Sequence, residues 1–145
     1  MDRRFERSAP PPDSAVKLLV DSTVWIDFFA ARQTAQTARL KQSIRDGNQI
    51  CVCGCVWLEV LQGVRLEKEY VAIKSHFEQL RYLDDDRSTY ELGATIYREL
   101  RRDGVTIRNS IDCLIAATVV QHGVNFLEND RDYKFIDQHF PLNRI

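Results

Sequence analysis

Acidic side chains stand just after several short apolar runs in this sequence, where an α/β protein commonly places its functional groups. Asp21 directly ends the first predicted strand, Glu59 lies one helical turn after the second, and Asp130 follows the third by three residues. A fourth acid, Asp112, occupies the first turn of a predicted helix. Functional groups of open parallel sheets gather outside the carboxyl ends of the strands. We therefore expect these four carboxylates to converge at one edge of a sheet.

Carboxylates gathered in this way predict a site for a divalent cation, because they would repel one another strongly without one. Hard oxygen ligands suit Mg²⁺ or Mn²⁺. Such an ion activates a water molecule as the nucleophile and stabilises the oxygens of an in-line displacement at phosphorus. We therefore predict that the four acids bind Mg²⁺ or Mn²⁺ and catalyse the hydrolysis of phosphodiester bonds.

Each acid also has a structural interpretation. The chain has 21 acids among 145 residues, so one acidic position alone is weak evidence. Asp112 and Asp130 can complement the dipoles of helix N-termini. Glu59 lies inside the apolar stretch 56–61, where burying a carboxylate is costly unless a cation accompanies it. Arg65 or another basic side chain could supply that charge, but a cleft that holds a metal ion is the better interpretation.

The elements that would position these acids alternate between strands and longer helical patterns, which predicts an α/β domain with a parallel sheet. Predicted strands span residues 16–20, 49–53 and 124–127, and residues 142–145 could add a short terminal strand. Helical patterns begin near residues 22, 36, 55, 69, 89 and 110, and a short helix follows residue 132. The pattern that begins at residue 69 continues to residue 83, so we predict one helix there.

Length and charge limit the alternatives. A chain of 145 residues fits one domain, and 44% hydrophobic residues are enough for a packed core. We expect residues 1–15, which are polar and rich in proline, to be disordered, and residues 16–145 to form the domain. A net charge of −1 argues against binding of nucleic acid by bulk charge alone. No run approaches the roughly 20 apolar residues of a membrane span, so we expect a soluble, cytoplasmic protein.

The four cysteines allow two interpretations, a metal or redox site and small buried side chains. Cys51, Cys53 and Cys55 alternate along the chain, and Cys113 lies far from them in sequence. No CxxC pair occurs and no histidine lies near them in sequence. Free cysteine is among the most buried residue types, so this pattern favours buried small residues.

Four motifs surround the acids, residues 19–28 (LVDSTVWIDF), 56–63 (VWLEVLQG), 110–118 (SIDCLIAAT) and 129–133 (NDRDY). With these motifs the chain resembles the PIN-domain family, and within it the VapC-type toxins. Their order and spacing agree with the family from about residue 17 onwards. The resemblance implies a three-layer α/β/α sandwich with a central, mainly parallel sheet, and a metal-dependent endoribonuclease that forms the toxin half of a toxin–antitoxin pair.

The same resemblance assigns roles and partners. It makes Asp21, Glu59 and Asp112 the principal acids, with Asp130 as the fourth ligand and Asp132 as a less certain one. It implies that Ser22 or Thr23 steadies the site by hydrogen bonds. It further implies an RNA substrate, a homodimer, and a cognate antitoxin that lays a peptide segment across the cleft in a hetero-oligomeric complex.

Two departures from the family pattern concern the surroundings of these acids. Glu128 stands where many relatives have a small hydroxyl residue, which bears on the orientation of Asp130. Asn109 and Ser110 precede Asp112 where an acid or threonine is common. Neither departure removes a principal acid.

Basic residues beside the acidic motifs, among them Arg108 and Arg131, are candidate contacts for RNA phosphates, and a solvated charged surface is the alternative. For the whole chain, two other functions stay open. One is a non-catalytic PIN-like module that binds RNA or an antitoxin. The other is a nuclease of the same scaffold directed at DNA or at a particular nucleic-acid structure.

Overall fold

The computed structural model describes residues 16–145, and the predicted disordered segment 1–15 lies outside them. The described residues form one sheet of four parallel strands in the order β3-β2-β1-β4. The strands are β1 (Lys17–Val20), β2 (Gln49–Cys53), β3 (Arg81–Leu83) and β4 (Asn125–Leu127). Because every pair is parallel, the carboxyl ends of all four strands lie at the same edge of the sheet.

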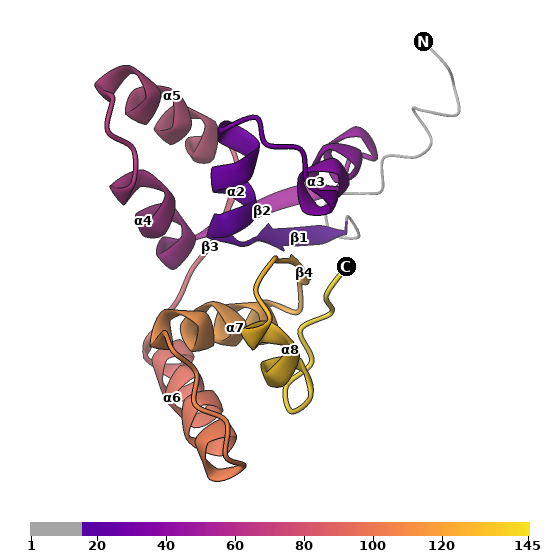
Figure 1. Cartoon of the computed structure of the whole chain (residues 1–145), viewed down its shortest axis with the longest axis vertical. Coiled ribbons are helices and arrows are strands. Elements are labelled where there is room, and N and C mark those ends of the chain that lie inside the picture. Colours follow the sequence, from indigo (N-terminus) through magenta and orange to yellow (C-terminus); the bar gives the residue numbers. More distant parts are fainter. Residues whose placement is uncertain (1–15) are drawn as a thin grey trace.

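Helices lie on both sides of this sheet (Figure 1). One side carries α2 (Ser22–Phe29), α3 (Ala35–Arg45), α4 (Gly54–Gln62) and α5 (Glu67–Glu78). The other carries α6 (Arg87–Arg102), α7 (Ser110–His122) and α8 (Asp132–Asp137). The predicted three-layer α/β/α sandwich with a parallel sheet is therefore confirmed. No helix among residues 16–145 is long and apolar enough to cross a membrane.

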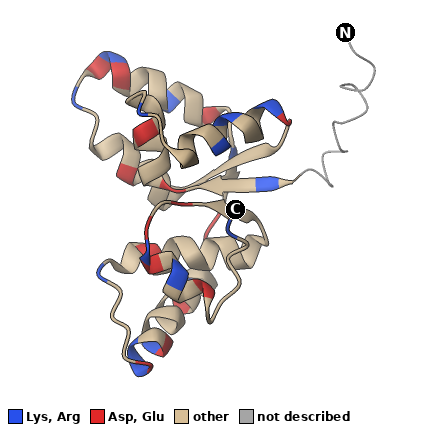
Figure 2. Ribbon diagram, turned by 45° about the vertical axis from the view of Figure 1, so that its right-hand side comes forward, with Lys and Arg blue, Asp and Glu red and all other residues tan. Residues whose placement is uncertain are grey.

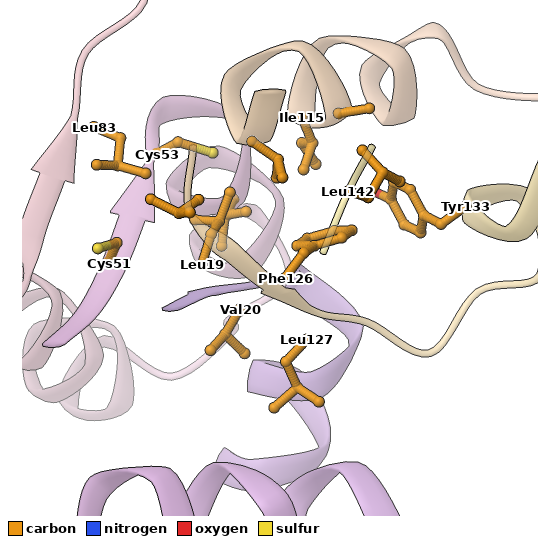
Figure 3. Close-up of a cluster of buried hydrophobic side chains, with 14 of the residues drawn as sticks. Leu19, Val20, Cys51, Cys53, Leu83, Ile115, Phe126, Leu127, Tyr133 and Leu142 are labelled. Carbon is orange, nitrogen blue, oxygen red and sulfur yellow. The ribbon is translucent and has the colours of Figure 1, made fainter. Parts of the chain in front are cut away.

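The centre of the core is β1, which lies between β2 and β4 and is covered on both faces. Leu19 pairs with Phe126 and Val20 with Leu127, and all four side chains are buried. In Figure 3 the first pair points towards α7 and the second pair points to the opposite side of the sheet. A strand buried on both faces has a continuous apolar sequence, which is why residues 18–20 contain no polar position.

Helix α7 begins and ends at the residues that the sequence signals indicated. The side chain of Asn109 accepts a hydrogen bond from the amide of Ile111 at 3.0 Å, as an N-cap residue does. Gly123 ends the helix with φ of 62°, a left-handed conformation that glycine adopts without a steric penalty. These two ends fix where Asp112 stands, in the first turn of α7.

The prediction of a single helix over residues 69–83 is wrong. Helix α5 ends at Glu78, and Arg81–Leu83 forms β3 at the edge of the sheet, parallel to β2. Only Leu83 of this strand is buried, and three residues are too few to show the alternation of apolar and polar side chains that predicts a strand. The suggested terminal strand at 142–145 is reduced to one isolated bridge between Arg144 and Phe126.

The cysteines are small core residues in the described part of the chain. Cys51, Cys53 and Cys113 are buried, Cys55 is half-buried, and all four thiols are free. Burial raises the pKa of Cys53 to about 12, so its thiol stays protonated at neutral pH. The prediction of buried small residues is confirmed for the three buried cysteines.

Candidate metal centre

Asp21 stands where β1 ends and α2 begins. Its backbone N–H donates to the carbonyl of Leu127 at 2.9 Å, which continues the pairing of β1 with β4 by one residue. Its side chain is 3% exposed, and Thr23 Oγ1 donates to its Oδ2 at 3.1 Å. The end of a central strand and the first turn of a helix together hold this carboxylate at the edge of the sheet.

Glu59 is joined to this position by a hydrogen bond between two helices. Ser22 Oγ, in the first turn of α2, donates to Glu59 Oε1 on α4 at 3.1 Å. Ser22 is itself buried and Glu59 is half-buried. The first two sequence motifs, 37 positions apart at these residues, therefore meet through a serine hydroxyl.

Three further carboxylates cluster where α7 begins, in the connection between β4 and α8, and at the first residue of α8. Asp112, Asp130 and Asp132 each offer an oxygen, and these oxygens all lie within 4.8 Å of one another. Asp130 Oδ1 also accepts the backbone N–H of Asp132 at 2.9 Å, which fixes the turn between them. Asp132, the less certain of the expected ligands, is the most buried of the three.

Tyr133 connects the two groups of acids. Its hydroxyl lies 3.2 Å from Asp21 Oδ1 and 3.3 Å from Asp112 Oδ1, so it can donate its single proton to either carboxylate. The ring is fully buried and packs edge-on against Phe126, with the ring centroids 4.8 Å apart. No role for Tyr133 was predicted from the sequence. The only signal was a tyrosine, rather than a purely apolar ring, directly after Asp132.

The electrostatics of the site disfavour its negative charges. Burial, with a smaller contribution from the charge of Glu59, raises the pKa of Asp21 to about 6. Burial, together with the charges of Asp21 and Asp130, raises the pKa of Asp112 to about 7. The ordinary value for both is 3.8, so each carboxylate holds its proton more tightly than a free aspartate does.

Basic residues reach the rim of the site but do not neutralise it. Arg108 Nε lies 3.6 Å from Asp132 Oδ2, and the arginine side chain is 69% exposed. Arg131 lines a pocket of about 570 Å³ that also includes Asp130 and Lys134. Acidic and basic residues are interspersed over both helical layers and the segments between them (Figure 2). The structure thus places both predicted phosphate contacts beside acids of the cluster.

The donor set fits a hard divalent cation. The converging side chains are carboxylates that come from both sides of the sheet. Burial, together with neighbouring negative charge, raises the pKa of two of them, Asp21 and Asp112. A cation placed there would relieve the repulsion and favour the ionised form of every ligand. Mg²⁺ and Mn²⁺ are the ions that such oxygen ligands suit best.

Comparisons with known proteins show the family of the chain. Residues 18–138 match the family model described as PIN domain. A VapC ribonuclease from Mycobacterium bovis and ribonuclease VapC11 from Mycobacterium tuberculosis are each 28% identical over 121 residues, covering 82% of this chain and 90% of the relative.

Solved structures share the fold at low sequence identity. VapBC2 from Rickettsia felis, bound to a promoter DNA fragment, has a TM-score of 0.69 at 16% identity and covers 90% of this chain and 96% of its own. The VapC20 toxin from Mycobacterium tuberculosis, which cleaves the sarcin–ricin loop, has a TM-score of 0.58 at 15% identity and covers 86% and 97%. Since the matched region includes residues of all four strands and every acid of the cluster, the chain belongs to the PIN domain family.

Proposed function

We propose that this protein is a metal-dependent endoribonuclease and the toxin of a toxin–antitoxin pair. The observation that carries the proposal is the convergence of Asp21, Glu59, Asp112, Asp130 and Asp132 from four separate segments of a PIN domain. The relatives named as ribonucleases support RNA as the substrate class.

In this proposal Asp112, Asp130 and Asp132 hold the ion, because their oxygens are the closest set. Asp21 faces the same space across the hydroxyl of Tyr133. Mg²⁺ or Mn²⁺ held there would supply an activated water nucleophile and would stabilise the charge that develops on the phosphate oxygens.

The remaining residues of the site orient its acids and hold the substrate. Ser22 fixes Glu59, Thr23 fixes Asp21, and Tyr133 keeps Asp21 and Asp112 on either side of one hydroxyl. Arg108 and Arg131, both exposed beside the acids, bind the phosphates that flank the scissile bond.

The partner in this proposal is a cognate antitoxin, since several of the structures that share the fold are toxin–antitoxin complexes. An apolar pocket of about 610 Å³ between α2, α4 and α5 would accept an apolar segment of such a partner. It is lined in part by Ile26, Phe29 and Ile73, and Ile26 is 42% exposed. The toxin itself is expected to form a homodimer.

The test compares wild-type protein with Asp112→Asn, purified identically, on a pool of cellular RNA in Mg²⁺, Mn²⁺ or EDTA. We expect cleavage only by the wild type with metal, and a loss of at least about 100-fold in the variant. Equal cleavage by both proteins would indicate a contaminating nuclease. Tight binding of intact RNA in Mn²⁺ would favour the non-catalytic module, which the retention of all the acids argues against. A flap DNA substrate in parallel distinguishes the DNA-directed alternative.

A further inference from the structure

Glu128, the residue that follows β4, accepts a hydrogen bond from the backbone of the acidic loop, residues 129–132, which carries two of the proposed metal ligands and ends at the first residue of α8. Its side chain is 10% exposed, and its Oε2 accepts the backbone N–H of Asp130 at 2.7 Å. Asp130 Oδ1 in turn accepts the N–H of Asp132 at 2.9 Å. The two hydrogen bonds follow one another along the chain, so the position of Glu128 bears on the conformation of the whole loop.

The other carboxylate oxygen of Glu128 is bound by Arg144, a residue that lies outside the four motifs. Arg144 Nη1 lies 3.3 Å from Glu128 Oε1, and Arg144 Nε lies 3.2 Å from Asp137 Oδ2 at the end of α8. The guanidinium group therefore joins two carboxylates, one before and one after the loop. Such charge-assisted hydrogen bonds from a planar donor set both distance and orientation.

The backbone around Arg144 is itself fixed against the sheet. The N–H of Phe126 donates to the carbonyl of Asn143 at 3.1 Å, and the N–H of Ile145 donates to the carbonyl of Phe126 at 3.0 Å. The N–H of Leu142 donates to Asp137 Oδ1 at 2.9 Å. The segment 142–145 thus connects β4, α8 and, through Arg144, the acidic loop.

We propose that Glu128 and Arg144 are a positioning pair, which sets the geometry of Asp130 and Asp132 without touching the metal or the RNA. This inference rests on the proposed function, because it assumes that the two aspartates bind the ion. Without Arg144, the mostly buried Glu128 carboxylate would stand near Asp130 and Asp137 with its main cation removed. It would then turn towards solvent and release the amide of Asp130.

The pair explains how a glutamate serves at a position where a smaller side chain would be simpler. A serine hydroxyl can accept the N–H two residues ahead without help from a cation. A glutamate makes the same bond but leaves a buried negative charge, which only a partner such as Arg144 balances. The loop of this chain therefore depends on segment 142–145, whereas a loop with serine would not.

The experiment measures two quantities separately, the protection of the loop amides in the metal-free protein and the affinity for metal. The variants are Glu128→Ala, Glu128→Ser, Arg144→Ala and the double variant Glu128→Ser with Arg144→Ala. Amide hydrogen exchange by NMR reports the Asp130 and Asp132 N–H groups without metal. Calorimetric titration with Mn²⁺ reports affinity without RNA. We expect Glu128→Ala and Arg144→Ala each to speed exchange of both amides by about tenfold, as the loss of one hydrogen bond does, and to weaken Mn²⁺ binding by about tenfold or more.

Glu128→Ser provides a readout that general destabilisation would not give. It should restore slow exchange and Mn²⁺ affinity to within about threefold of wild type, and adding Arg144→Ala to it should change neither value. Arg32→Ala, which removes an ion pair with Asp27 on the opposite helical layer, is the matched control and should leave both readouts unchanged. Its ion pair has an exposed arginine, as in many surface pairs of small energetic effect.

Wild-type exchange of the Asp130 and Asp132 amides in both alanine variants would overturn the proposal, whether or not the protein binds metal. Equal losses of amide protection and Mn²⁺ affinity in Glu128→Ser and Glu128→Ala would also overturn it, since the serine hydroxyl would then fail to replace the carboxylate. Failure of wild-type protein to bind Mn²⁺ would instead contradict the proposed function, while the exchange data still decide the role of the pair.

Discussion

Replacing Asp21 by asparagine should stabilise the metal-free protein at neutral pH, although Asp21 is a principal acid of the site. The folded state holds the proton of Asp21 more tightly than the unfolded chain, since burial raises its pKa from 3.8 to about 6. Above about pH 6 the folded protein therefore carries a charge that it disfavours, and its stability falls as the pH rises from about 4 to 6. Asparagine has no such charge.

The size of the effect follows from the shift. A difference of about two pKa units corresponds to about 3 kcal/mol at pH 7.5. The amide offers one acceptor oxygen where the carboxylate offers two to Thr23 and Tyr133, which costs about 1 kcal/mol. The net gain of about 2 kcal/mol would raise Tm by roughly 4–8 °C for a domain of this size. At pH 4 the gain should vanish, because the wild-type side chain is then largely protonated.

Mn²⁺ should reverse the order of thermal stability, so that the wild type melts above Asp21→Asn. A ligand at about 100 times its Kd stabilises the folded state by about 2.7 kcal/mol. We expect the wild type to gain this amount at pH 7.5 and Asp21→Asn to gain much less, because it lacks one of the acids around the ion. Thermal melts in EDTA and in Mn²⁺, at pH 4 and pH 7.5, measure all four combinations.

Asp27→Asn is the control on the same helix. Asp27 makes an ion pair with Arg32 at 2.9 Å, and its loss should change stability by less than about 1 kcal/mol, equally with and without Mn²⁺. If Asp21→Asn melts below the wild type in EDTA at pH 7.5, Asp21 is a favourably paired structural carboxylate. That result would refute the expectation that burial disfavours the charge of Asp21.

Three other substitutions test the surroundings of the site. Tyr133→Phe removes the hydroxyl between Asp21 and Asp112, and should lower the free energy of unfolding in urea by about 1–2 kcal/mol and Mn²⁺ affinity by about tenfold; no change in either would deny the hydroxyl a role. Phe126→Ala empties the centre of the core beside the tyrosine ring and should cost about 3–5 kcal/mol in the same assay, whereas a cost below about 1 kcal/mol would mean that the core collapses freely. Gly123→Ala places a side chain at φ of 62° and should cost about 1 kcal/mol by thermal melting, with Mn²⁺ binding unchanged.

Much of the architecture could be predicted because its local signals agree with its tertiary role. The run 18–20 is apolar at every position since β1 is buried on both faces, and Asn109 and Gly123 mark the ends of α7 by their own chemistry. Strand β3 could not be predicted, since its one buried residue, Leu83, continues the helical spacing of the preceding segment. Its identity as a strand comes only from pairing with β2.

The candidate site also has parts that could be predicted from the sequence and parts that could not. The positions of Asp21, Asp112 and Asp130 relative to strand and helix ends could be predicted from the sequence. The bridge made by Tyr133 could not, because its partners lie 112 and 21 positions away along the chain. The ion pair between Arg144 and Glu128 could not be predicted either, since the two residues are distant in the sequence and no local pattern links them.

The contact between Tyr133 and Asp21, which are 112 positions apart in the sequence, has a consequence for a chain that is still being synthesised. Strand β1 and Asp21 leave the ribosome before β4, Asp130 and Tyr133, because they precede them in the sequence. Closing contacts across more than 100 positions is slow and must await both partners. A nascent or prematurely terminated chain therefore carries at most part of the proposed centre. The cell that makes the protein would meet the complete centre only after translation has passed its final motif.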